Sequence, residues 1–354
     1  MIKNIEIENI KNSNLYKELK NIYIDKFSFN YLNTDFIIDT KFFFPISIKS
    51  YETSTGLFSN YSRFKYEIFF SKKYYNFIRE NTNQMISFNK AFVVGSSNNY
   101  YHLLIDWLPR LFALNKHILK KIDKVIFSSE YLQSSYLVQF ILNELKIDKE
   151  IIFLEKGSYL FKDSFIPINL SLEEKIFFYR RTFSNYMKFQ KEEKIYIVRK
   201  DSKNRKIINE EKLIQFLKKQ NFKIVELSKY NFNDQISLFS NAKIIISMHG
   251  AGLANLIFCK KSTQVIEIVH DINKKDEDWF CSSTDFKFTN LARDHFAQIS
   301  KIIKLDHLLY FCVDNIINKN DKNDKLILKK ITNTDLSIDV QRFSKFYNKN
   351  YNNL

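Results

Sequence analysis

Apolar and polar positions alternate in two kinds of segment from residue 91 onward. Short apolar runs rich in Val, Ile and Phe are typical of buried strands, and longer segments with apolar residues three and four apart are typical of helices. Strands are expected at 91–97, 124–129 and 150–156, and helices at 100–114 and 131–145. Because strands alternate with helices, this half of the chain predicts a parallel sheet covered by helices, the α/β class.

A second series of the same kind follows a helix expected between Ser171 and Phe189. Its strands are expected at 194–200, 222–228, 243–250 and 264–269, and its helices at 207–220, 233–242 and 251–259. The charged run 188–194 separates the two series. We therefore expect an N-terminal domain at 1–190, a second α/β domain at 191–300 and a C-terminal tail at 301–354.

The two ends of the chain carry weaker patterns. Residues 61–68 alternate aromatic and polar side chains, which predicts a half-buried strand within a leader of about 90 residues. The apolar stretch 305–317 predicts a helix, and the Lys/Asn-rich stretch 318–325 predicts a loop. An amphipathic segment at 335–349 is expected to pack back on either domain.

The chain of 354 residues carries a net charge of +16, which raises the question of a nucleic-acid partner. Lysine and arginine clusters supply most non-specific affinity for nucleic acids. Here, however, Lys, Asn, Ile, Phe and Tyr dominate the whole composition, and the sequence has no helix-turn-helix, zinc-finger spacing or arginine-rich arm. We expect no nucleic-acid partner, and peripheral contact with anionic lipids stays an alternative use of the charge.

The N-terminal residues and the cysteines bear on location. Residues 1–12 lack the apolar stretch of a signal peptide, and no window approaches the roughly 20 apolar residues of a membrane span. We therefore expect a cytoplasmic protein. Cys259, Cys281 and Cys312 are far apart and lack metal-ligand spacing, so they are expected to be reduced thiols.

Candidate chemistry gathers at the strand ends of the second series, where parallel sheets bind ligands. Two of the chain's five glycines stand one residue apart between a strand and a helix. Glycine there lets the backbone approach a ligand, and the free N–H groups of a helix start can bind an anion. A tight turn without a ligand is the alternative. The strand-end residues are Arg199, Lys200, Arg205, His249, Gly250, Ala251, Gly252 and Glu267.

The charged strand-end residues predict charge compensation without a metal. Arg199 and Arg205 carry the planar fork that binds phosphates bidentately, so neither a metal nor another cofactor is expected. Glu267 lies in an apolar strand, where an unpaired carboxylate is costly, and predicts a partner such as a ribose diol or an arginine. As an alternative, Asp276 and Asp278 fit the DxD pattern that holds a divalent cation, although such clusters are more often solvated turns.

A second candidate group lies on the helix expected at 100–114. His102, Asp106 and Arg110 are spaced by four, which predicts one helix face. A histidine and a carboxylate one turn apart can act as a general base and its orienting partner. The spacing leaves open which of the two takes the proton, and a histidine paired with Asp106 for stability alone is the alternative.

Three stretches resemble glycosyltransferase family 61: NNYYHLLIDWLPRL, VRKDSKNRKIINEEKL, and ISMHGAGLANLIF followed by VIEIV. The resemblance covers about residues 95–270. It implies a GT-B-like fold, in which two Rossmann-like parallel-sheet domains face each other across a cleft, with the donor held by the second domain and the acceptor by the first. It also implies inverting transfer from a UDP-sugar without a metal. By the same resemblance, Asn255 joins the donor-side residues, His102 and Asp106 lie near the reacting centre, and Arg110 is expected on the acceptor side.

These patterns lead to one hypothesis and two alternatives. The hypothesis is an inverting glycosyltransferase that moves a sugar from a nucleotide-sugar to a glycan or lipid-linked glycan of bacterial capsule or lipopolysaccharide. One alternative is a non-catalytic protein that binds nucleotides or glycans, and the other is a metal-dependent transferase that uses Asp276 and Asp278. Leu103 follows His102 where the family often has an aromatic residue, which leaves the acceptor undecided.

Overall fold

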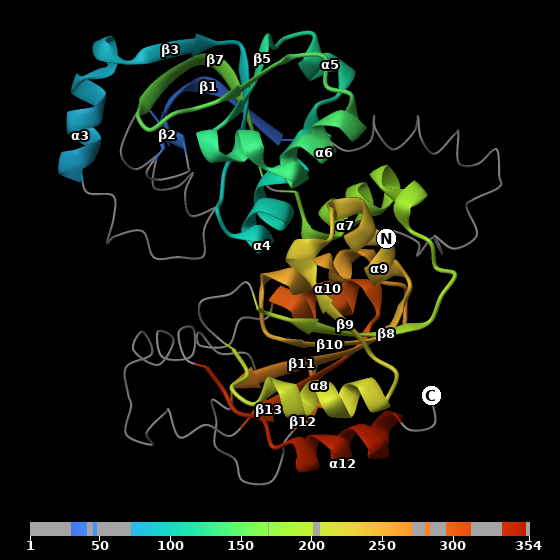
Figure 1. The fold of residues 1–354 in the computed structure, drawn as a ribbon. Coiled ribbons are helices and arrows are strands. Elements are labelled where there is room, and N and C mark those ends of the chain that lie inside the picture. Colours follow the sequence, from blue (N-terminus) through green and yellow to red (C-terminus); the bar gives the residue numbers. More distant parts are fainter. Residues whose placement is uncertain are drawn as a thin grey trace, which may run out of the picture. The chain divides into compact units, whose positions relative to one another are not determined.

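The computed structural model describes residues 30–40, 45–47, 72–168, 170–200, 206–270, 280–283, 295–312 and 335–351. The chain divides into two compact units (Figure 1). The first comprises Met1–Asn98, Asp106–Val138 and Lys146–Ser171, and the second comprises Asn99–Ile105, Gln139–Leu145 and Leu172–Leu354. Each unit contains a mixed sheet of mostly parallel strands, so the predicted α/β class is confirmed.

The sheet of the first unit has the order β2-β1-β7-β4-β5-β6, and β3 also pairs with β7. Strands β3 to β7 pair in parallel, whereas β1 pairs antiparallel with β7 on one side and with the edge strand β2 on the other. The strands expected at 91–97, 124–129 and 150–156 are confirmed as β4, β5 and β6. The bounds are β1 Asn30–Asp39, β2 Pro45–Ser47, β3 Ile86–Asn89, β4 Ala91–Gly95, β5 Lys124–Phe127, β6 Glu150–Phe153 and β7 Ser158–Ile168.

Helices of several types follow these strands. The segment expected as one helix at 100–114 is three short pieces: α4, the π-helix η4 and the 3-10 helix η5. The strand expected at 61–68 and the loop expected at 318–325 lie outside the described residues. The bounds are α3 Lys72–Glu80, η3 Thr82–Gln84, α4 Tyr100–His102, η4 Leu103–Trp107, η5 Leu108–Ala113, α5 Lys116–Leu119, η6 Glu130–Ser134, α6 Tyr136–Leu145, α7 Leu172–Thr182 and η7 Ser184–Tyr186.

The sheet of the second unit has the order β12-β13-β11-β10-β8-β9. All pairs are parallel except that of β12, which lies antiparallel at the edge. The chain moves from β8 outward to β9 and then returns to β10 on the other side of β8. The strand order therefore reverses between β8 and β10, the point where open α/β sheets bind ligands. The bounds are β8 Glu193–Val198, β9 Lys223–Glu226, β10 Ala242–Met248, β11 Gln264–His270, β12 Phe280–Ser282 and β13 Asp306–Cys312.

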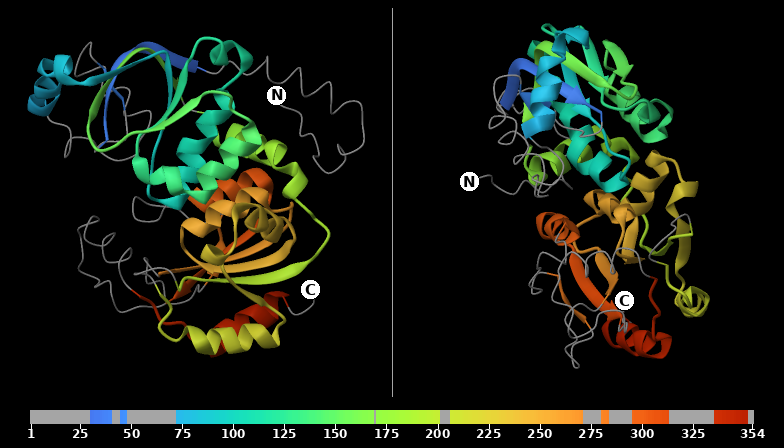
Figure 2. Two further views of the ribbon diagram at one scale, coloured as in Figure 1. Left: turned by 45° about the horizontal axis from the view of Figure 1, so that its top comes forward. Right: turned by 90° about the vertical axis from the view of Figure 1, so that its left-hand side faces the viewer.

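Helices cover both faces of this second sheet (Figures 1 and 2). On one face, α8 (Glu210–Lys219) and α12 (Val340–Tyr351) pack together, and their apolar side chains form one core with those of β8, β10, β11 and β13. On the other face, the 3-10 helix η9 (Ala251–Phe258) packs against α9 (Phe232–Ser240) and α10 (His295–Ile303). The 3-10 helix η8 (Leu227–Lys229) follows β9.

Most sequence predictions for this unit hold, with one clear exception. The expected strands become β8, β9, β10 and β11, and the amphipathic segment at 335–349 is confirmed as α12 of this unit. The helix expected at 305–317 is wrong over its described part, because 306–312 forms β13, paired along its full length with β11. A short apolar run fits a buried strand and a buried helix equally well, and only its neighbours decide.

Two further features concern composition and membranes. Cys259, Cys281 and Cys312 are free thiols, and the first and last are buried. Within the described ranges, no helix combines the length and apolarity that crossing a bilayer requires.

Candidate active site

Two of the predicted strand ends meet at the point where the strand order reverses. Arg199 directly follows β8 and His249 directly follows β10, and these strands are parallel neighbours in register at Ile197 and Ser247. Nη1 of Arg199 donates a hydrogen bond to the backbone oxygen of His249 over 3.0 Å. The side chain that ends one strand therefore holds the turn that ends the other.

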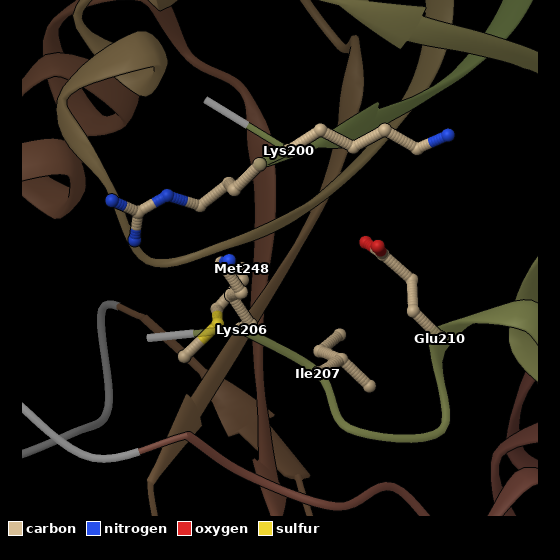
Figure 3. A pocket seen from close by; sticks show the side chains of 6 residues that line it. Lys200, Lys206, Ile207, Glu210 and Met248 are labelled. Carbon is tan, nitrogen blue, oxygen red and sulfur yellow. The ribbon is translucent and has the colours of Figure 1, made fainter. Parts of the chain in front are cut away.

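A pocket of about 180 Å³ opens beside this contact (Figure 3). It brings together three cationic side chains, one carboxylate and two apolar side chains. Its lining residues are Arg199, Lys200, Lys206, Ile207, Glu210 and Met248. Ligand pockets for whole small molecules measure about 300–1,000 Å³, so this pocket has room for part of a ligand, such as a phosphate group or a single sugar ring.

Glu210, at the start of α8, is a site residue that the sequence prediction missed. Its carboxylate points toward the side chain of Lys200 in Figure 3. The hydroxyl of Tyr196, from β8, donates to Oε1 of Glu210 over 2.8 Å. Burial raises the pKa of Glu210, and the hydrogen bond from Tyr196 and the charge of Lys200 oppose that rise. The Asn-Glu pair of the motif VRKDSKNRKIINEEKL was the signal that could have identified it.

The glycine pair after β10 allows two close approaches. A Cβ at Gly250 would lie 3.1 Å from Cζ of Arg199, which is tighter than ordinary contact. A Cβ at Gly252 would lie 2.6 Å from Cδ1 of Leu227, a distance that cannot be tolerated without a shift. Ala251 begins the 3-10 helix η9 directly behind Gly250. Only His249 and Gly250 lie between β10 and η9, and anion binding by the N–H groups at the start of η9 stays a prediction.

The buried carboxylate of Glu267 was expected to have a partner, and it contacts two histidines. Its side chain lies in β11 and is almost inaccessible, with 4% of the residue exposed. Oε1 forms a hydrogen bond with Nδ1 of His249, and Oε2 lies 3.0 Å from Nε2 of His307. Behind it, Nδ1 of His307 lies 3.0 Å from the hydroxyl of Ser300. A role of Glu267 in donor binding stays a prediction.

The electrostatics of this cluster keep the carboxylate charged. Burial by itself would raise the pKa of Glu267, but the charge and hydrogen bond of His249, together with those of His307, lower it well below its usual range. The sequence prediction missed His307 because its segment resembled a helix, in which the side chain has no reason to face β11. Val265 pairs with His307, so Glu267, two residues further along β11, shares that face of the sheet.

Asn255 is buried at the centre of a second polar cluster. Its Nδ2 donates to Oε1 of Gln235 over 3.0 Å and to the backbone oxygen of Gly252 over 3.2 Å. Its Oδ1 accepts from the hydroxyl of Tyr100 over 2.9 Å. Asn255 therefore links η9 to α9 and to α4, and in this arrangement it supports the shape of the glycine turn.

The group expected on the helix at 100–114 does not lie on one regular α-helix. His102 ends α4, Asp106 lies in the π-helix η4 and Arg110 lies in the 3-10 helix η5, so the expected continuous α-helix is wrong. A shared face for the three side chains stays a prediction. His102 belongs to the second unit and Asp106 to the first, and their role as base and partner stays a prediction.

Arg110 is buried in the first unit, with 8% of the residue exposed. Its Nη1 donates to the backbone oxygen of Val94 over 2.9 Å, and its Cζ lies 4.2 Å from the centre of the Trp107 ring. These contacts hold the end of β4, and the expected acceptor-side role stays a prediction. Arg205, Asp276 and Asp278 lie outside the described residues.

Comparison with known protein families finds a match for the part of the chain that carries most of the candidate site. The family model described as glycosyltransferase 61 matches residues 100–266. This stretch belongs to the glycosyltransferase 61 family. It contains Arg199, His249 and Asn255 and ends one residue before Glu267, so the glycosyltransferase 61 region covers most of the candidate site.

A curated relative supports the same family. The protein O-linked-mannose beta-1,4-N-acetylglucosaminyltransferase 2 of Xenopus laevis is 38% identical over 68 residues. This match spans 18% of the present chain and 12% of the length of the relative. Together, the family and the relative support glycosyl transfer as the chemistry of the glycosyltransferase 61 region.

Proposed function

We propose that this protein is an inverting glycosyltransferase that moves a sugar from a UDP-sugar to a glycan or lipid-linked glycan during synthesis of bacterial capsule or lipopolysaccharide. The observation that carries the proposal is the cationic pocket at the point where the strand order reverses, between β8 and β10. In the GT-B-like arrangement that we propose, the second unit holds the donor and the first holds the acceptor. The reaction takes place in the cytoplasm, with peripheral contact at the inner membrane.

The pocket supports diphosphate binding through its charges. Arg199, Lys200 and Lys206 offer three positive charges, and an arginine fork suits two phosphate oxygens at once. The N–H groups at the start of η9 add donors on the same edge of the sheet. Because these groups neutralise a leaving diphosphate without a divalent cation, we propose a metal-independent reaction.

The proposed chemistry requires one proton acceptor. The acceptor hydroxyl oxygen forms a bond to the anomeric carbon while the bond from that carbon to the diphosphate oxygen breaks, which inverts the configuration. The hydroxyl proton passes to a general base, for which we propose His102 with Asp106 as its partner. The electron pair of the broken bond leaves on the diphosphate, where the cations of the pocket stabilise it.

Calorimetric titration of UDP into three lysine variants tests the donor site. Lys200→Gln and Lys206→Gln each remove a charge from the pocket, and Lys345→Gln removes the same charge from an exposed position of α12. Since a hydrogen bond to a charged group contributes about 1.5 kcal/mol, each pocket variant is expected to weaken UDP binding about tenfold. The α12 variant should bind like the wild type.

Unchanged UDP affinity in both pocket variants would refute the assigned donor site. Release of UDP from a UDP-sugar in the presence of acceptor then separates an enzyme from a binding protein. If that release is lost in EDTA and restored by manganese, the metal-independent part of the proposal is wrong, and the alternative with Asp276 and Asp278 is supported instead.

A further inference from the structure

The side chains of Ser300, His307, Glu267 and His249 form one continuous polar chain through the second unit. Ser300 lies on α10, His307 on β13, Glu267 on β11 and His249 at the end of β10. Each side chain contacts the next at hydrogen-bonding distance. We call these four side chains, which come from four separate elements, the histidine relay.

The histidine relay has a buried end and an accessible end. The His307 side chain is 1% exposed, and Ser300 is buried. By contrast, the His249 side chain is 30% exposed and follows the strand end that Arg199 holds. The relay therefore runs from the interior outward and ends at His249, whose backbone oxygen is bonded to the pocket residue Arg199.

The charge of Glu267 decides where the protons of the relay lie. A carboxylate accepts hydrogen bonds and donates none, so the histidine nitrogen that faces each of its oxygens must carry a proton. His249 therefore carries a proton on Nδ1, and His307 carries one on Nε2. Nδ1 of His307 lies 3.0 Å from the hydroxyl of Ser300, which as a donor and acceptor can pair with this nitrogen in either direction. In this arrangement each oxygen of the Glu267 carboxylate faces a protonated histidine nitrogen.

Burying the polar side chains of the relay costs free energy, which indicates that the relay has a purpose other than stability. Polar and ionic groups in a protein interior lose their hydration, and apolar side chains of similar volume are often as stable or more so. A hydrogen bond to a buried carboxylate fixes the tautomer of a histidine and the direction of its ring. In the relay only His249 reaches an accessible surface, so the orientation set inside the unit is used at that ring.

We propose that His307 and Ser300 are positioning residues of the donor site, acting through Glu267 to hold His249 with its proton on Nδ1 and its Nε2 offered to the donor. The proposal deepens the proposed function and rests on it for the identity of the donor. His307 and Ser300 touch no substrate themselves. They lie outside residues 100–266, the stretch that matches the family model.

Nitrogen-15 spectra of histidine-labelled protein report the tautomer of each histidine directly. The His249 signals are assigned by their loss in His249→Gln. In the wild type we expect Nδ1 of His249 to be protonated. His307→Phe removes both nitrogens of the ring, so we expect a mixture of His249 tautomers and UDP binding about tenfold weaker, the loss of one hydrogen bond to a charged group.

Two variants separate positioning from general stability. His307→Gln keeps an N–H that can reach Glu267, so it should restore the His249 signals and most of the UDP affinity. Thr263→Val removes a buried hydrogen bond to the backbone oxygen of Ala242 in the same sheet, and it should lower the melting temperature without changing the His249 signals.

The proposal is overturned if His249 is neutral with its proton on Nε2 in the wild type. It is equally overturned if a folded His307→Phe protein shows unchanged His249 signals. Should His307→Phe fail to fold, Ser300→Ala answers the same question, because loss of the hydroxyl is expected to shift the tautomers in the same direction. A wild type that binds no UDP contradicts the proposed function, while the spectra still decide the relay.

Discussion

Replacing Glu267 with glutamine removes one buried charge at nearly constant side-chain volume. In the folded protein, burial raises the pKa of Glu267, but His249 and His307 outweigh burial and lower it to about 2. In an unfolded chain the pKa is about 4.3. Since a tenfold change in proton affinity corresponds to about 1.4 kcal/mol, the difference stabilises the folded wild type by roughly 3 kcal/mol.

The sign of this contribution sets the pH window. A carboxyl group with a lowered pKa in the folded state stabilises that state fully above its unfolded pKa, and the stabilisation is lost as the pH falls through the folded value. The advantage of the wild type over Glu267→Gln should therefore be constant at neutral pH, shrink below about pH 4 and vanish near pH 2.

Urea unfolding followed by circular dichroism measures this difference. Wild type and Glu267→Gln are compared at a series of pH values from about 7 down to about 3. Glu150→Gln serves as the control, because it removes an exposed carboxylate whose ion pair with Lys124 is solvated and contributes little. If the difference in the free energy of unfolding between wild type and Glu267→Gln stays constant across the whole pH range, Glu267 is not charged in the folded protein.

Two other changes have expected outcomes. Gly95→Ala should lower the melting temperature sharply, because Gly95 has a φ of 99° and the new Cβ would lie 2.0 Å from the Trp107 ring, a clash that costs about 2 kcal/mol or more. In the control Gly157→Ala, the new Cβ has contacts no closer than 3.4 Å, so the melting temperature should change little. Equal melting temperatures of the two variants would contradict the reasoning. Tyr100→Phe should cost about 1–2 kcal/mol in urea unfolding, since Oδ1 of the buried Asn255 loses its donor, and a variant as stable as the wild type would show that another group replaces the hydroxyl.

The strands of both sheets were largely predictable from the sequence because each is a short apolar run bounded by polar residues. The run at 306–312 fits the same description, yet it was predicted to be helical. Its burial is not strictly alternating, and it becomes a strand because it pairs with β11 along seven positions. Such pairing joins residues about 40 positions apart, and local patterns carry no record of it.

The helix expected at 100–114 failed for a different reason. The prediction assumed regular α-helical spacing, but Pro109 lies inside the segment, in the first turn of η5. Proline has no N–H to donate and excludes a continuous α-helix through its position. The sequence thus contained the sign that residues 100–114 would not form one regular α-helix.

The candidate site was predictable in its location and less so in its details. Topology alone places the ends of neighbouring parallel strands at one edge, so Arg199 and His249 could be brought together from the sequence. The partners of Glu267 could not be predicted, because they depend on which way His307 points across the sheet. Glu210 was visible in the sequence only as part of a motif, and its place in the pocket needed the geometry.

We propose above all that the donor nucleotide binds at the carboxyl ends of β8 and β10. Hydrogen–deuterium exchange with and without saturating UDP tests it at the level of single peptides. We predict slower exchange in two sets of peptides: those that contain residues 206–212, which include three pocket residues, and those that contain residues 249–255, which include the glycine turn. Slower exchange confined to peptides of the first unit, or no change anywhere at saturating UDP, would contradict the claim.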